Sequence, residues 1–196
     1  MADAVEKLTV DVNDEDAVTA LLYPAAKKNR AGLTLLLGHG AGANQTSGFV
    51  RLFADGLAAR GFDVMTFNFV YMERGRSVPD QKAKLESCFR AVINAALKHR
   101  KLKQNRLIVG GKSMGGRIAS QVLASEDISE VVGLVFLGYP LHPPGNPAKL
   151  RVEHLEHVGK PMLFVQGTRD SLGTPEEIQP FVKKLRPPAT IYAIEG

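Results

Sequence analysis

The chain has 196 residues, 44% hydrophobic and 23% charged, which favours one soluble globular domain spanning 1–196. Its one cysteine, Cys88, excludes an internal disulfide framework, and its longest apolar run, 131–140, is about half a membrane span. The net charge of +5 is scattered along the chain, without zinc-ligand spacing or paired stacking aromatics. The first residues lack the basic and apolar regions of a secretory signal. We therefore expect a cytoplasmic protein with no nucleic-acid or membrane partner; its oligomeric state stays open.

The N-terminal part of the chain predicts a β-hairpin. Residues 5–12 alternate apolar and polar side chains, as a half-buried strand does, and a polar turn separates them from a second strand at 17–24. The next segment, 33–40, starts with a continuous apolar run, which is typical of a parallel strand buried on both faces. The sheet is therefore expected to change from antiparallel to parallel after the hairpin.

Beyond residue 33, strand-like and helix-like segments alternate. The apolar spacing predicts helices over 47–60, 79–100, 114–125 and 174–185, with a short one between 148 and 157. It predicts buried strands over 62–70, 106–111, 131–140, 161–168 and 189–196. This alternation predicts an α/β fold with a mainly parallel sheet, helices on both faces and an N-terminal antiparallel hairpin.

A serine between glycines stands where a buried strand meets a helix. The segment 111–115 reads Gly-Lys-Ser-Met-Gly and fits the G-x-S-x-G motif, in which a sharp turn lifts the serine hydroxyl above the sheet. Glycines flank the serine because a Cβ would clash in so tight a turn. The motif predicts Ser113 as a nucleophile, although a strand-to-helix turn that merely needs glycines remains the alternative.

Two phosphate-binding motifs compete for the same stretches. A phosphate loop needs a glycine six positions before its lysine, but Arg106 occupies that position and a strand follows it. Residues 38–43 fit the dinucleotide pattern G-x-G-x-x-A, yet the next strand ends without the acid that this pattern requires, and Asp63 stands at its start. We therefore interpret 38–43 as an oxyanion loop.

The oxyanion loop and an acidic residue complete the predicted chemistry. Backbone N–H groups near Ala41 and at Met114 are expected to hold a developing negative oxygen. Hydrolases of this type carry an acid later in the chain, and Asp170 follows the strand at 161–168. A turn aspartate is the alternative reading of Asp170.

Several of these segments together resemble a known family. These segments are GHGAG, FNFVYMERGR, GGKSMGGR, GYPLHPPGNPAKLR, LFVQGTRD and the closing IYAIEG. They resemble a small α/β-hydrolase family that is related to the dienelactone hydrolases and includes the hydrolase-like domain of a chromatin-complex subunit and a testis-expressed homologue. The resemblance implies that Ser113 is the nucleophile, Asp170 the acid, and Ala41 and Met114 the oxyanion hole. Dienelactone hydrolases carry cysteine at this strand-to-helix turn (the nucleophile elbow, residues 111–115), whereas this chain carries serine.

The base that would activate the serine is missing from its expected place. All five histidines precede Asp170, whereas the family implies a histidine a few residues after the last strand, followed by a final helix. Without that helix, the last strand is expected to expose Ile191 or Tyr192. We expect that the natural chain continues, that these 196 residues hydrolyse activated esters weakly, and that a longer form does better. Equal activity of the two forms would point to His142 as the base.

The sequence thus predicts a serine hydrolase that acts on a small ester, thioester or related acyl substrate without metal or cofactor. The segment 141–160 is too short for a large lid, which favours an open site. Tyr71, Arg74 and Tyr139 are candidate pocket residues, with Arg74 or Arg76 placed to meet a carboxylate; His39 and His142 are candidates for the pocket wall or for loop structure. The alternative is a hydrolase-like fold that binds a partner without catalysis.

Overall fold

The predicted N-terminal hairpin is confirmed. The computed structural model describes residues 4–196, so the first three residues of the predicted domain lie outside it. Strands β1 (Glu6–Asp11) and β2 (Ala17–Tyr23) pair antiparallel. Asn13 closes the turn between them, because its side-chain oxygen accepts the N–H groups of Glu15 and Asp16, each at 2.9 Å.

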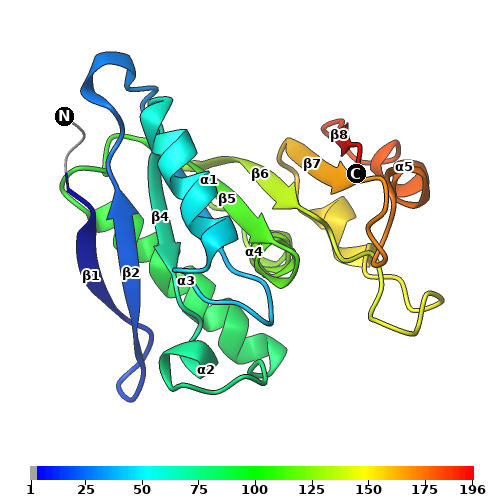
Figure 1. The fold of residues 1–196 in the computed structure, drawn as a ribbon, viewed down its shortest axis with the longest axis horizontal. Coiled ribbons are helices and arrows are strands. Elements are labelled where there is room, and N and C mark those ends of the chain that lie inside the picture. Colours follow the sequence, from blue (N-terminus) through cyan, green and yellow to red (C-terminus); the bar gives the residue numbers. More distant parts are fainter. Residues whose placement is uncertain (1–3) are drawn as a thin grey trace.

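The remaining strands form the predicted parallel part of the sheet (Figure 1). Their order across the sheet is β1-β2-β4-β3-β5-β6-β7-β8, and every neighbouring pair from β4 to β8 is parallel. The carboxyl ends of these strands therefore share one edge, where side chains from separate loops meet. The strands are β3 (Leu33–Gly38), β4 (Asp63–Phe67), β5 (Arg106–Lys112), β6 (Val131–Leu137), β7 (Met162–Gly167) and β8 (Thr190–Ile194).

The elements follow the predicted order, with the unpredicted η1 and three further differences. The strand predicted over 62–70 stops at Phe67, since the N–H of Phe69 is donated to the ring of His39 instead of a neighbouring strand. A short helix, α2, begins next, and the helix predicted within 148–157 is one 3₁₀ segment, η2. The helices are η1 (Lys27–Asn29), α1 (Gly48–Ala59), α2 (Val70–Glu73), α3 (Lys82–Lys98), α4 (Met114–Ser125), η2 (Glu153–His157) and α5 (Pro175–Val182).

Helices lie on both faces of the sheet, as predicted, but they cover the two faces unequally. On one face, α3, α4, η2 and α5 bury a continuous core that includes Phe136 and Phe164, whose ring centroids are 4.4 Å apart. On the other face, α1 is the one helix among the described residues that contributes to a smaller core, where Val50 and Ala54 are fully buried in a cluster with side chains of β3 and β4. None of the described helices is long and apolar enough to cross a membrane.

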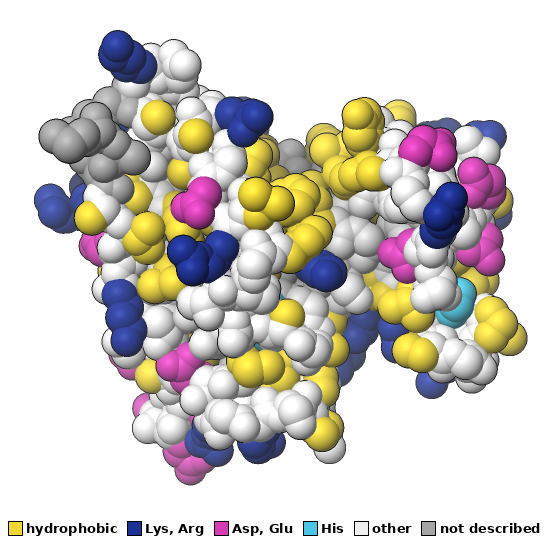
Figure 2. Space-filling model, viewed as in Figure 1, with side chains coloured by type: hydrophobic (Ala, Val, Ile, Leu, Met, Phe, Trp, Pro, Cys, Tyr) yellow, Lys and Arg dark blue, Asp and Glu magenta, His cyan; other side chains and the backbone are white. Residues whose placement is uncertain are grey.

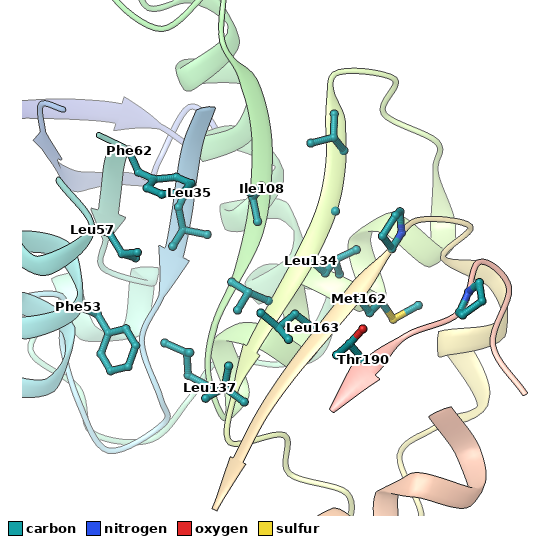
Figure 3. A pocket seen from close by; sticks show the side chains of 16 residues that line it. Leu35, Phe53, Leu57, Phe62, Ile108, Leu134, Leu137, Met162, Leu163 and Thr190 are labelled. Atoms are coloured by element: carbon teal, nitrogen blue, oxygen red, sulfur yellow. The ribbon is translucent and has the colours of Figure 1, made fainter. Parts of the chain in front are cut away.

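Beside α1, the second face of the sheet is hollowed. A cavity of about 590 Å³ lies between Phe53 and Leu57 of α1 and the apolar side chains of β5, β6 and β7 (Figure 3). The space-filling view, in the orientation of Figure 1, shows hydrophobic side chains gathered on this side of the molecule (Figure 2). Leu163 is 38% exposed here, and Tyr192 is 63% exposed on β8, whereas Ile191 packs against the covered face. The last strand was expected to expose either Ile191 or Tyr192, and Tyr192 is the more exposed of the two.

Candidate active site

The turn between β5 and α4 holds Ser113 in a strained conformation. The backbone of Ser113 has a φ of 49° and a ψ of −111°. Ser113 is the one non-glycine residue with positive φ among residues 4–196. Such a backbone costs on the order of 1–3 kcal/mol and persists only where the surrounding structure enforces it. The turn therefore has the geometry that the G-x-S-x-G motif predicts.

Close packing of backbones enforces this turn. A Cβ on Gly115 would lie 2.4 Å from the carbonyl carbon and oxygen of Gly38, at the end of β3. A Cβ on Gly111 would lie 2.2 Å from the same oxygen, and Gly111 itself has a φ of 154°. No side chain fits between the first turn of α4 and β3, so only glycine allows the two backbones to approach this closely.

The loop after β3 lies beside Ser113. A Cβ on Gly40 would be 3.8 Å from the Cβ of Ser113. The His39 ring is buried and supports this loop: its Nε2 accepts the N–H of Phe69 at 3.1 Å, so Nδ1 carries the proton and donates to the carbonyl of Gly40 at 2.8 Å. Burial also lowers the pKa of His39, which keeps the ring neutral.

Two backbone N–H groups near Ser113 are free to bind a ligand. Within the described residues, the N–H groups of Ala41 and Met114 have no hydrogen-bond acceptor. The carbonyl of Ala41 is fixed from the other side, because the hydroxyl of the buried Tyr71 donates to it at 2.9 Å. Free N–H groups on a fixed loop and at a helix N-terminus suit a developing negative oxygen.

Asp170 lies in the loop after β7 and is held by hydrogen bonds. Its Oδ1 accepts the N–H of Leu172 at 2.9 Å, and its Oδ2 accepts the side-chain amide of Gln166 at 3.1 Å. Gln166 is fully buried and also bonds the carbonyl of Gly173 at 2.6 Å and the N–H of Tyr139 at 2.7 Å. Sequence reasoning missed Gln166, and its signal was a polar residue near the carboxyl end of an otherwise apolar strand.

The end of β6 separates Ser113 from Asp170 by one strand. The N–H of Ser113 donates to the carbonyl of Leu137 at 3.2 Å. The next residue, Gly138, lies against the acid, since a Cβ there would be 3.1 Å from Oδ2 of Asp170. Ser113 and Asp170 therefore flank the Leu137–Gly138 peptide from opposite sides.

Residues 31–196 match a family model described as an alpha/beta hydrolase domain. The chain belongs to the α/β hydrolase family. This confirms the fold class and the resemblance to α/β hydrolases related to dienelactone hydrolases.

Three solved structures share the fold of this hydrolase domain. A serine hydrolase homologue from Coxiella burnetii matches 97% of this chain and 87% of its own, with a TM-score of 0.77 and 18% identity. A serine hydrolase without a lid from Xanthomonas campestris matches 100% and 85%, with a TM-score of 0.77 and 17% identity. A dienelactone hydrolase from Anabaena variabilis matches 98% and 86%, with a TM-score of 0.76 and 18% identity. At such identities the likeness concerns the fold alone.

No histidine of residues 4–196 is hydrogen-bonded to Ser113 or Asp170 in this hydrolase domain. His142 is linked to Asp170 through Leu172. The backbone N–H of His142 donates to the carbonyl of Leu172, and the backbone N–H of Leu172 donates to the Asp170 carboxylate. The Nδ1 of His142, however, lies 3.1 Å from the carbonyl of Pro143. His99 lies beside Glu6 on β1, and His154 bonds Ser120 on α4.

Three residues predicted to line the pocket form contacts within the protein: Tyr71, Tyr139 and Arg74. Tyr71 is fully buried and holds the Ala41 carbonyl. Tyr139 is buried against Phe136 and donates its hydroxyl to the carbonyl of Arg151, because a phenol in a core needs an internal partner. Arg74 lies 2.6 Å from the buried carboxylate of Asp16, and the second arginine considered, Arg76, pairs with Asp80 at 2.6 Å. Each of these two guanidinium groups therefore already has a carboxylate partner within the chain.

The residues of the two competing motifs also have structural contacts in the hydrolase domain. Lys112 ends β5, and its Nζ lies 4.4 Å from the centre of the Phe49 ring, so a strand occupies the place of a phosphate loop. Asp63 is buried and binds the N–H of Ala25 and the Arg30 guanidinium. In the described part of the chain, no group of three or more His, Cys, Asp or Glu side chains could hold a metal ion.

Proposed function

We propose that this α/β hydrolase domain is a serine hydrolase that cleaves a small carboxylic ester, thioester or related acyl substrate through an acyl-enzyme. The observation that carries the proposal is the strained Ser113 beside two unbonded N–H groups. A nucleophile held in an unfavourable backbone conformation and next to an oxyanion hole is arranged for attack on a carbonyl.

The proposed reaction assigns a role to each of the candidate residues. The Ser113 oxygen attacks the acyl carbon while its proton passes to a base, and the N–H groups of Ala41 and Met114 bind the oxygen of the tetrahedral intermediate. The intermediate collapses to an acyl-serine as the protonated base returns its proton to the leaving alcohol or thiol. Water then hydrolyses the acyl-serine by the same route. Asp170 orients the base, and this chemistry requires neither metal nor cofactor.

The base must contact both Ser113 and Asp170, and this requirement restricts its position. It belongs beside Leu137 and Gly138, which Ser113 and Asp170 flank. His142 lies in the neighbouring loop and is the candidate among the described residues. The end of β8 reaches the same edge, because the N–H of Thr168 donates to the carbonyl of Ile194 at 2.9 Å. A histidine that followed β8 would therefore arrive beside the Asp170 loop.

A fluorophosphonate probe tests the proposal, because it reacts with an activated serine. We expect covalent labelling of the wild type, measured by intact mass, and no labelling of Ser113→Ala. Ser129→Ala, which removes an exposed serine, is the matched control and should label normally. Labelling that survives Ser113→Ala would overturn the assignment of the nucleophile.

His142→Asn separates the two candidate positions of the base. Its labelling rate should fall by roughly two orders of magnitude or more if His142 is the base, and should change little if it is not.

The second candidate function is a hydrolase-like domain that binds a partner without catalysis. It is favoured by the absence of a histidine bonded to Ser113 or Asp170 among residues 4–196. A wild type that is folded by circular dichroism, stays unlabelled and hydrolyses p-nitrophenyl acetate no faster than Ser113→Ala would favour this reading.

A further inference from the structure

The two edges of the sheet differ in how they are protected against further strands. The strand order starts at β1 and finishes at β8, so each of these strands has one side without a neighbouring strand among the described residues (Figure 1). The sequence of β1 is Glu-Lys-Leu-Thr-Val-Asp, and its three charged side chains discourage pairing with another strand. The sequence of β8 is Thr-Ile-Tyr-Ala-Ile, which carries no charge. The side of β8 that faces away from β7 is therefore an unprotected strand edge.

The backbone groups of Ile191 and Ala193 face this open side. The carbonyl of Ile194 accepts the N–H of Thr168 at 2.9 Å, so the backbone groups of Ile194 point toward β7. Successive residues of a strand direct their N–H and C=O groups to opposite sides, so those of Ile191 and Ala193 point away from β7. Two residues thus offer donors and acceptors that a further strand can satisfy.

The side chains of β8 add exposed apolar surface beside this edge. Thr190 lines the cavity next to α1 (Figure 3). Because side chains alternate along a strand, Tyr192 and Ile194 lie on the same face of the sheet as Thr190. Tyr192 is 63% exposed and Ile194 is 46% exposed, and the half-exposed Leu163 of β7 continues this surface. Apolar side chains next to an unpaired backbone edge mark an interaction surface.

We propose that β8 pairs antiparallel with β8 of a second copy of this chain, across a twofold axis. Two identical uncharged strands meet without like-charge repulsion, and the edge offers no charge that would select a different partner. A twofold axis uses the same edge of both copies, so the assembly closes at two. The two sheets become one continuous sheet. This dimer does not rest on the proposed serine hydrolase activity.

The backbone directions determine the register of the pair. Ile191 lies opposite Ala193 of the other copy, and Ala193 opposite Ile191, because these residues carry the outward N–H and C=O groups. Tyr192 then lies on the twofold axis opposite its own counterpart, with the two Cα atoms about 4.5 Å apart. The two tyrosine rings gain a cross-strand aromatic contact. Glu195 falls opposite Ala189 of the other copy, so this register brings no like charges together.

Sedimentation equilibrium over a range of protein concentrations tests the dimer. We expect the wild-type mass to rise toward twice the monomer mass, with a Kd of roughly 1–100 µM because paired edges form a small interface. Ala193→Pro removes an outward N–H and keeps the bonds to β7, and Tyr192→Lys places two charges opposite each other. Each should raise the dimer Kd at least tenfold. Val5→Lys, which changes an exposed valine just before β1, is the matched control and should keep the wild-type Kd.

Disulfide crosslinking tests the register. Tyr192→Cys places two thiols opposite each other on the twofold axis, at a separation that a disulfide can bridge, so mild oxidation should give a covalent dimer on a non-reducing gel. Thr190→Cys is the matched control, because its residue lies opposite Ile194 of the other copy, and it should stay monomeric on the gel. The natural Cys88 is buried and should not react.

Several outcomes would overturn the proposal. A wild type that stays monomeric at every concentration excludes the dimer, and species that grow beyond two copies contradict the twofold axis. A dimer with an unchanged Kd in both Ala193→Pro and Tyr192→Lys belongs to another surface. Equal crosslinking of Tyr192→Cys and Thr190→Cys contradicts the register. If Ala193→Pro is unfolded by circular dichroism, Tyr192→Lys and the two cysteine variants decide.

Discussion

The two loops that carry the candidate catalytic residues are held by different forces. The Ser113 turn is fixed by backbones in contact, with Gly111 and Gly115 pressed against Gly38. The Asp170 loop is fixed by side-chain hydrogen bonds that converge on Gln166. A Cβ added to either glycine would lie 2–3 Å from backbone atoms, which the packed turn cannot accommodate by small shifts. A hydrogen-bonded loop can instead lose its bonds one at a time. We therefore expect changes at the elbow to be all-or-none and changes near Asp170 to be graded.

The largest effect is expected for Gly115→Ala. Its Cβ would lie 2.4 Å from the backbone of Gly38, so α4 must move away from β3. We expect a loss of more than about 3 kcal/mol in the free energy of unfolding by urea, together with complete loss of fluorophosphonate labelling. Gly56→Ala makes the same change inside α1, where the nearest heavy atom is the Nη1 of Arg60 at 3.6 Å, and should raise stability by roughly 0.5–1 kcal/mol.

Gln166→Ala tests the hydrogen-bonded loop. It leaves the N–H of Tyr139 and the carbonyl of Gly173 without their partner, and we expect a loss of about 2–3 kcal/mol. Because Asp170 also loses a donor, the labelling rate should fall without vanishing. Gln179→Ala, on the exposed face of α5, should stay within about 0.5 kcal/mol of the wild type. A complete loss of labelling at wild-type stability would contradict the graded behaviour.

Ser113→Gly measures the strain stored in the elbow. Glycine adopts positive φ without cost, so this variant should be about 1 kcal/mol more stable than Ser113→Ala, although neither is labelled. Urea unfolding of the two variants gives the difference directly. Equal stabilities would mean that the turn holds no strain to release.

The smallest effect is expected at the cap that ends the Asp170 loop. Thr174 and Glu177 form a capping box at the start of α5, and Thr174→Ala should cost about 1 kcal/mol while labelling is kept. Ser47 occupies the same position before α1 but makes no capping bond, and its buried hydroxyl has no partner. Ser47→Ala should therefore change stability by less than about 0.5 kcal/mol, as thermal unfolding of both variants can check.

Local sequence patterns predicted most of the fold. Apolar spacing located the hairpin, every parallel strand and the helices near the elbow, because burial on one or both faces dictates which positions are apolar. The pattern failed where a tertiary contact overrode it, at Phe69, which bonds the His39 ring instead of extending β4. The G-x-S-x-G motif located the strained turn, since glycine is the residue that such a turn requires.

Only those residues of the candidate site that lie within one sequence motif could be predicted together with their roles. Ser113 and Met114 follow from the motif at the strand-to-helix turn, but nothing local in the sequence indicates which groups Gln166 contacts. Tyr139 was predicted as a pocket residue because it follows a strand at the carboxyl edge, yet its ring turned into the core. Which way a loop side chain points depends on the neighbouring elements, and sequence spacing does not encode it.

The sequence by itself determined which strands the two candidate catalytic residues follow. The serine follows β5 in a tight turn, the acidic residue follows β7, and both strands belong to a parallel sheet. Motifs and apolar periodicity are local, so they can be read along the chain. Only the tertiary structure decided that Ser113 and Asp170 flank Leu137 and Gly138, and that Arg74 pairs with Asp16. These are contacts between distant segments, and they exist only once the sheet and its helices have packed.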